Sequence, residues 1–214
     1  LYSNISGNTN CAFGYQSLSS NTTNNNSAFG YEALKANTTG TANSAFGLQA
    51  LKNSTIAGYN SAFGYAAMFT NTTGGNNTAV GFYALFNNTI GYANAAVGVE
   101  ALKANTTGIT NSAFGSKSLI ANTTGSNNSA FGYNAGSAVT TGTNLTIIGY
   151  NAAASAVGAT NEVTLGNSSV ATLRCQVTTI TALSDERDKT DINNVEVGLS
   201  FVEKLRPVTF KWDK

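Results

Sequence analysis

The 214-residue sequence contains no histidine, one proline and two cysteines, and charged residues make up 10 % of it. The absence of histidine excludes every nucleophilic site that depends on an imidazole base. A formal net charge of +1 provides no basic surface, so we expect no nucleic-acid partner. No run of 18 apolar residues is present, so we expect no insertion into a membrane. Neither a cofactor nor a metal site is expected.

What the sequence does contain is a repeat. The stretch from Asn26 to Ala42 is 17 residues long and begins again at Asn43. Its glycine recurs with a first step of 16 residues and eight later steps of 17 residues. These glycines are Gly14, Gly30, Gly47, Gly64, Gly81, Gly98, Gly115, Gly132, Gly149 and Gly166. A constant period of this kind indicates stacked units that bury a shared core.

Two columns of large apolar residues follow this period, one directly before the glycine and one four residues after it. The first column contains Phe13, Phe29, Phe46, Phe63, Val80, Val97, Phe114, Phe131, Ile148 and Leu165. The second column contains Leu18, Leu34, Leu51, Met68, Leu85, Leu102 and Leu119. Because equivalent side chains fall one above another in such a stack, we expect both columns to lie inside.

Small residues, chiefly alanines, form columns of their own directly before the two apolar columns. The first of these columns includes Ala28, Ala45, Ala62, Ala79, Ala96 and Ala113. Such a column would leave a smooth surface that lets neighbouring chains approach closely. Three chains around one axis would bury this surface and hide the strand edges. We therefore predict a homotrimer.

The length of the repeat decides among the classes of repeat protein. Repeats built from helix pairs need about 33 residues, and leucine-rich repeats need about 20. The Asn-Thr-Thr-Gly segments that close most repeats are typical of tight corners, because Asn and Gly tolerate left-handed backbone conformations. We therefore predict an all-β chain, in which residues 1–166 form a parallel β-solenoid or β-roll of about ten 17-residue rungs with one or two short strands each.

Changes in composition divide the chain into three segments. Residues 1–150 are predicted to form the repeat shaft, residues 151–183 a β-rich stem or neck, and residues 184–214 the truncated beginning of a small α+β module. In the stem, residues 167–181 alternate and are rich in Val and Thr, which favours a strand. The module opens with a charged run, and its apolar pattern favours a short helix at 197–205 followed by a strand.

The two cysteines, Cys11 and Cys175, lie about nine rungs apart in the predicted stack. A disulfide between them within one chain would need their Cα atoms to lie closer than about 7 Å, which a linear stack does not allow. Two interpretations remain. The cysteines are either two buried thiols or residues that link different chains near a symmetry axis.

The Asn-Ser-Ala-Phe-Gly and Asn-Thr-Ala-Val-Gly repeats resemble the head repeats of trimeric autotransporter adhesins and the repeat shafts of phage and large-virus fibres. The resemblance covers residues 1–150, although the adhesin heads have a shorter period. It implies a trimeric, structural and adhesive protein.

A second resemblance concerns Leu-Ser-Asp-Glu-Arg-Asp-Lys-Thr-Asp-Ile at residues 183–192 and Leu-Arg-Pro-Val-Thr-Phe-Lys-Trp at residues 205–212. These segments resemble the start of the C-terminal intramolecular chaperone of endosialidase tailspikes and other tail fibres. The resemblance implies a module that trimerises, helps the fibre to fold and then cuts itself off between Ser184 and Asp185. It also implies that Ser184 and Lys189 form a catalytic dyad.

The chemistry of this dyad is consistent with the composition. A serine hydroxyl is a poor nucleophile unless a base accepts its proton, and the chain has no histidine to do so. A lysine can serve as the base where burial lowers its pKa. The alternative interpretation is that Ser184 caps a turn and that Lys189 is a solvated charge.

Together these features predict the structural shaft of a phage tail fibre or surface appendage, on the virion surface or outside the cell. A host-surface receptor or glycan is a further expected partner. A bacterial surface adhesin is one alternative. An ice- or surface-binding solenoid is another, because paired threonines such as Thr38-Thr39 would form ladders, although the repeats at Ser54-Thr55 and at Thr89 interrupt them. A glycosidase is not supported, because the carboxylates of the repeats lie many rungs apart.

Several corners carry Asn-x-Thr sequons, which are candidate glycan acceptors in a eukaryotic secretory pathway. The sequon asparagines are Asn21, Asn37, Asn71, Asn105 and Asn122. The alternative is that these asparagines and threonines satisfy the backbone groups of the corners.

Overall fold

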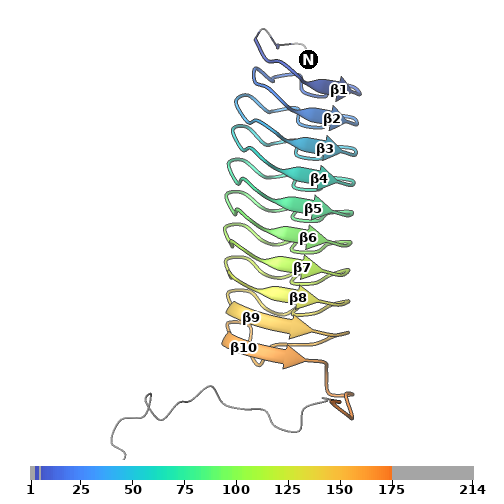
Figure 1. Ribbon diagram of the computed structural model, residues 1–214, viewed down its shortest axis with the longest axis vertical. Coiled ribbons are helices and arrows are strands. Elements are labelled where there is room, and N and C mark those ends of the chain that lie inside the picture. Colours follow the sequence, from blue (N-terminus) through green and yellow to red (C-terminus); the bar gives the residue numbers. More distant parts are fainter. Residues whose placement is uncertain (1–2, 5, 175–214) are drawn as a thin grey trace, which may run out of the picture. The chain divides into compact units, whose positions relative to one another are not determined.

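The computed structural model describes residues 3–4 and 6–174. Ten parallel strands form one sheet whose strand order follows the sequence (Figure 1), and the described residues contain no helix. The predicted all-β parallel solenoid is therefore confirmed, with one strand per rung. The strands are β1 (Cys11–Phe13), β2 (Ser27–Phe29), β3 (Ser44–Phe46), β4 (Ser61–Phe63), β5 (Thr78–Val80), β6 (Ala95–Val97), β7 (Ser112–Phe114), β8 (Ser129–Phe131), β9 (Thr143–Ile148) and β10 (Thr160–Leu165).

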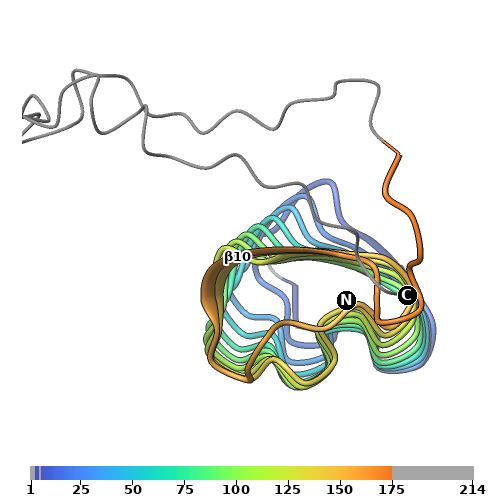
Figure 2. The ribbon, with the colours of Figure 1, turned by 90° about the horizontal axis from the view of Figure 1, so that it is seen from below.

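Each strand pairs in register with the strand of the next rung. Phe46 lies beside Phe29 on one side and beside Phe63 on the other. The same register continues to the last pair, where Ile148 lies beside Leu165. Seen from the end, the successive rungs follow nearly the same path (Figure 2). The register expected from the glycines is therefore confirmed.

The glycine after each strand is required for two reasons. Its backbone φ is positive, as at Gly64 with a φ of 138°, in a region that other residues rarely adopt. It also packs directly on the glycine of the next rung. A Cβ atom on Gly64 would lie 2.5 Å from the carbonyl oxygen of Gly81. Any side chain at this position would push two rungs apart, which accounts for the regularity of the glycine column.

The side chains of the last two residues of each short strand point in directions opposite to those predicted. Ala62 is fully buried, whereas Phe63 beside it is 40 % exposed, and this contrast recurs along both columns. The reason is the shortness of the strand. In Ser-Ala-Phe the side chains alternate between the two faces, so only the middle residue points inward. The predictions that the phenylalanine column lies inside and that the alanines form an outer surface are therefore wrong.

The second apolar column lies inside, as predicted. All seven of its members are fully buried. Each has a left-handed backbone conformation, as at Leu34 with a φ of 50°. That conformation costs about 1–2 kcal/mol per residue. Burying the side chain contributes about 1.5–3 kcal/mol, so the interior offsets the strain that the tight turn imposes.

Two ladders of buried asparagines complete the interior. The strand asparagine ladder contains Asn26, Asn43, Asn60, Asn77, Asn94, Asn111 and Asn128, and the corner asparagine ladder contains Asn21, Asn37, Asn71, Asn88, Asn105 and Asn122. In the strand ladder, each side-chain oxygen accepts a hydrogen bond from a backbone N–H one rung on, as Asn60 Oδ1 does from Asn77 at 3.0 Å. In the corner ladder the side chains bond one another, and Asn105 Nδ2 donates to Asn88 Oδ1 at 2.8 Å. Both ladders donate to the same corner carbonyl, that of Gly91, at 2.9 Å.

The repeat changes at its C-terminal end. β9 and β10 have six residues each instead of three. Val139 and Leu145 take the places of the ladder asparagines, and both are 1 % exposed. Gly136 takes the place of the column leucine, and Ile147 fills the space, since a Cβ on Gly136 would lie 2.9 Å from Ile147 Cδ1. The partly polar interior thus becomes apolar in the last rungs.

Residues Leu1–Ala171 form one compact unit, and the second unit begins at Thr172. The strand predicted for residues 167–181 is absent from its described part, residues 167–174. A turn interrupts it, in which Val170 N–H donates to the carbonyl three residues before at 3.1 Å. The helix and strand predicted for the C-terminal module lie outside the described residues. The boundaries between shaft, stem and module stay predictions.

Candidate functional site

The predicted catalytic dyad, Ser184 and Lys189, lies outside the described residues, as does the bond between Ser184 and Asp185. Within residues 3–4 and 6–174, no three His, Cys, Asp or Glu side chains gather in a way that could hold a metal ion. The dyad therefore stays a prediction, and the candidate functional features of the described part lie on the solenoid.

The five sequon asparagines all belong to the corner asparagine ladder and are fully buried. The nitrogen to which a glycan would be attached is already bonded inside the rung. Asn105 Nδ2 donates to Asn88 Oδ1 at 2.8 Å and to the carbonyl of Gly108 at 3.0 Å. The folded solenoid has no room for a glycan at such a nitrogen. The geometry supports the alternative interpretation, in which these residues satisfy the polar groups of the corners.

The first threonine of each corner forms an uninterrupted ladder. Its members are Thr22, Thr38, Thr55, Thr72, Thr89, Thr106, Thr123 and Thr140. The predicted interruption is therefore wrong for this column, and only the second column is broken, by Ile56 and Ile90. Each hydroxyl donates to the carbonyl one rung on, as Thr89 does to Thr106 at 3.0 Å. Because these hydroxyl hydrogens point along the shaft, the ladder is a backbone support and a poor template for ice.

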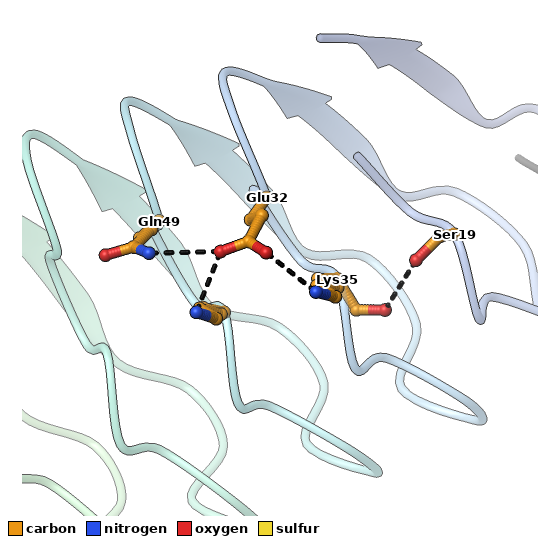
Figure 3. A network of polar contacts seen from close by, with 5 residues as sticks. Ser19, Glu32, Lys35 and Gln49 are labelled. Atoms are coloured by element: carbon orange, nitrogen blue, oxygen red, sulfur yellow. Dashed lines mark hydrogen bonds and ion pairs between the residues drawn. The ribbon is translucent and has the colours of Figure 1, made fainter. Parts of the chain in front are cut away.

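A cluster of polar side chains joins two rungs at a corner (Figure 3). Glu32, although only 6 % exposed, makes ion pairs of 2.7 Å with Lys35 of its own rung and with Lys52 of the next. Gln49, one rung on, donates a third contact to the same carboxylate at 3.0 Å. The ammonium group of Lys52 also lies over the ring of Phe69, 5.5 Å from its centroid. The cluster ties neighbouring rungs together.

The surroundings of Glu32 keep it charged. Hydrogen bonds from Lys35, Lys52 and Gln49 lower the pKa of its carboxyl to about 2. The hydrogen bond with Glu32 also raises the pKa of the Lys35 ammonium group. The other carboxylates of the described part, Glu100 and Glu162, lie on different rungs. A carboxylate that is ionised at neutral pH and has no second carboxylate beside it is suited to a structural role and not to general acid catalysis.

One exposed apolar column lies on the outer side of the sheet and a second lies in the turn that follows each strand, and we call the two together the apolar face. The inner column of this face is the phenylalanine column, from Phe13 to Leu165, and the flanking column consists of the residues directly after the first nine glycines of the repeat. The flanking column contains Tyr15, Tyr31, Leu48, Tyr65, Phe82, Val99, Ser116, Tyr133 and Tyr150. Eight of its nine members are apolar or aromatic, and all eight have exposed side chains. The sequence signal for this column, an apolar residue directly after the glycine, was missed.

The rings of the apolar face stack along the shaft. The centroids of Phe29 and Phe46 lie 4.8 Å apart with an interplanar angle of 9°, and those of Phe114 and Phe131 lie 5.1 Å apart at 1°. The expected stacking of Phe29, Phe46 and Phe63 is therefore confirmed, although it occurs outside the core. In such a stack each ring turns its faces to the rings of neighbouring rungs and its edge outward.

Cys11 is exposed and carries a free thiol. It occupies the first position of β1, which pairs with Ser27 of β2, so it shares the outer side of the sheet with the apolar face. The interpretation as a buried thiol is wrong for Cys11. Cys175 lies outside the described residues.

In the part of the chain that the structure describes, no helix is long and apolar enough to cross a membrane. No curated protein and no solved structure matches the chain. One family model does match, that of the peptidase S74 family, described as the chaperone of endosialidase. The match covers residues 184–214, so the segment that contains Ser184 and Lys189 is similar to this chaperone and follows a β-solenoid in the same chain.

Proposed function

We propose that this chain forms the shaft of a phage tail fibre or a similar surface appendage, and that its C-terminal segment assembles three copies and then releases itself by cleavage. The observation that carries the proposal is the succession of a β-solenoid and a segment similar to the chaperone of endosialidase. A location on the virion surface and contact with a host receptor or glycan belong to the same proposal.

The uniform repeat explains why a shaft of this kind needs a chaperone. Each rung offers the same strand, Ser-Ala-Phe or a close variant, to its neighbours. Copies that assemble side by side could slip by a whole rung and still pair similar residues. Long-range pairing in β-structures is also slow to nucleate. A clamp at the C-terminus of the shaft would fix the register before the rungs pack together.

Cleavage would follow assembly. Lys189 in its neutral form accepts the proton of the Ser184 hydroxyl, whose oxygen attacks the carbonyl carbon of the scissile bond. The amine of Asp185 leaves with a proton, and water then hydrolyses the ester. A serine that attacks its own carbonyl would close a strained four-membered ring, so we expect the attacking hydroxyl to come from a neighbouring chain. Loss of the clamp would make the assembled shaft slow to unfold.

The test compares full-length protein with the variants Ser184→Ala and Lys189→Met on denaturing gels. Each variant should stay uncut and still form trimers, which light scattering would report. Cleavage of either variant at the wild-type rate would exclude the dyad. Co-expression offers a second test, because Ser184→Ala chains should be cut in mixed trimers with wild-type chains. Failure to cut them there would exclude attack between chains.

A further inference from the structure

We infer that the apolar face is the surface on which copies of this chain pack against one another around a common axis. This inference rests on the proposed function, which requires assembly, and it assigns that assembly to named residues. The alanine columns, which the sequence suggested for this purpose, are buried within each solenoid and are not accessible to a partner. The phenylalanine column and the flanking column are two columns of mostly apolar side chains that the fold leaves largely uncovered.

The size of the face indicates a partner that runs along the whole shaft. The phenylalanine column has one member in each of ten strands, so it extends over nine steps of about 4.8 Å, or about 43 Å. Phe63 is 40 % and Tyr65 41 % exposed, and most residues of the two columns are exposed to a similar degree. Contiguous exposed apolar patches on soluble proteins, when they are large, mark sites of interaction. A second copy of the same rod matches it in length and spacing.

The distribution of charge also supports a second copy of this chain as the partner of the apolar face. The two columns and the outward position two residues before each member of the phenylalanine column contain no charged residue. Most charged residues of the described solenoid lie later in the rung, at the corner occupied by Glu32 and Lys35, and ion pairs join Lys35 and Lys52 to Glu32 and Lys103 to Glu100. Depletion of charge and enrichment of aromatic residues mark the centre of interfaces between proteins. A polar corner beside an uncharged apolar sheet is therefore the arrangement expected of a subunit in an oligomer.

The orientation of the rings argues for protein in preference to carbohydrate as the occupant. Sugars stack on open aromatic faces, but here the faces are turned toward one another along the column, with ring centroids 4.9 Å apart for Phe46 and Phe63. What the column presents outward is a row of ring edges. Edges pack well against the faces and edges of other aromatic rings. A copy of the same column supplies such rings at the same spacing.

The experiment places one charge on each of two exposed aromatic positions in the same part of the chain. Phe63→Asp alters the apolar face. Tyr59→Asp is the matched control, because Tyr59 is 66 % exposed but lies in a column whose neighbouring members are Ala42 and Asn76. At micromolar concentration, light scattering should show trimers for wild type and Tyr59→Asp, and at least a tenfold smaller trimeric fraction for Phe63→Asp. Circular dichroism should show the same β-structure in all three proteins.

Cysteine crosslinking keeps the inference testable if Phe63→Asp does not fold. In a background with Cys11→Ser and Cys175→Ser, Ser61→Cys should form disulfide-linked dimers on mild oxidation, whereas Thr107→Cys at an exposed corner should not. Position 61 tolerates cysteine, since Cys11 occupies the equivalent place in β1. Trimeric Phe63→Asp, or crosslinking only through Thr107→Cys, would overturn the assignment of the face and leave the trimeric shaft intact. A monomeric wild type would overturn both.

Discussion

At the scale of single residues, Ser54 interrupts the corner asparagine ladder between Asn37 and Asn71. Its side chain is too short to continue the ladder, so Asn37 Oδ1 and Ser54 Oγ are buried without hydrogen-bond partners. Leaving a buried polar atom unpaired costs about 1–3 kcal/mol. We predict that Ser54→Asn restores the ladder and raises the free energy of unfolding by about 1–3 kcal/mol, which denaturant titration would measure.

The neighbouring sequence favours this repair. Asn88 stands in the same context, Asn-Thr-Ile, and donates to Asn71 Oδ1 at 2.8 Å and to the Gly91 carbonyl at 2.9 Å. Ser54→Ala is the matched control, because it removes one unpaired atom but leaves Asn37 Oδ1 without a donor. If Ser54→Asn were no more stable than Ser54→Ala, the ladder would not have the importance that its geometry indicates.

Glu32 makes the stability of the shaft depend on pH in the acid range. Because its pKa is lowered to about 2 in the folded chain, the ionised form is favoured by folding. Its contribution to stability is therefore present above the ordinary value of 4.5 and is lost as the pH falls from there toward about 2. We predict that Glu32→Gln lowers stability at pH 7 and flattens the loss of stability between pH 4.5 and 2. Thermal unfolding across this range would measure both effects.

Glutamine is tolerated at this position of the rung, since Gln49 occupies it one rung on. The variant therefore changes charge and little else. An unfolding profile of Glu32→Gln that stays parallel to that of wild type throughout the acid range would show that the two lysines do not act through this carboxylate.

At the scale of the strand and its turn, the glycine column sets the spacing of the rungs. We predict that Gly64→Ala destabilises the solenoid by about 3 kcal/mol or more, because it combines backbone strain with a clash against the next rung. Gly158→Ala is the control, since its Cβ would meet only the Thr141 hydroxyl, at 3.2 Å. The free energies of unfolding of both variants would be compared, and equal losses would contradict this account of the column.

The strand also shows how far the sequence predicts the structure. The period, the register and the buried leucines follow from the sequence, because a nearly constant spacing places equivalent residues one above another in the stack. The directions in which the Phe63 and Ala62 side chains point did not follow from the sequence. Size suggested that phenylalanine belongs inside, but a three-residue strand leaves room for one inward side chain, and the leucine from the turn already fills most of the interior. The roles of the buried asparagines were only partly predicted, since polarity alone suggests exposure.

At the scale of the whole solenoid, nearly every contact joins a rung to its immediate neighbours. Stability in such a stack is approximately a sum over rungs and over the interfaces between them. The predicted catalytic dyad could not be placed in this scheme, because Ser184 and Lys189 lie outside the described residues. Their assignment depends on sequence similarity, whereas the apolar face depends on the geometry of the rungs.

The direction of the hydrogen bonds has a mechanical consequence. Bonds between strands, such as those that join β4 and β5, run along the shaft, so tension between its ends loads them in the direction in which they open. A single pulled solenoid would unwind from an end, one rung at a time. Seventeen extended residues span about 58 Å, against a rise of about 4.8 Å in the stack. Each rung that unfolds would lengthen the chain between the two ends by about 53 Å. The shaft would therefore extend in equal steps, one rung at a time, and not in a single event.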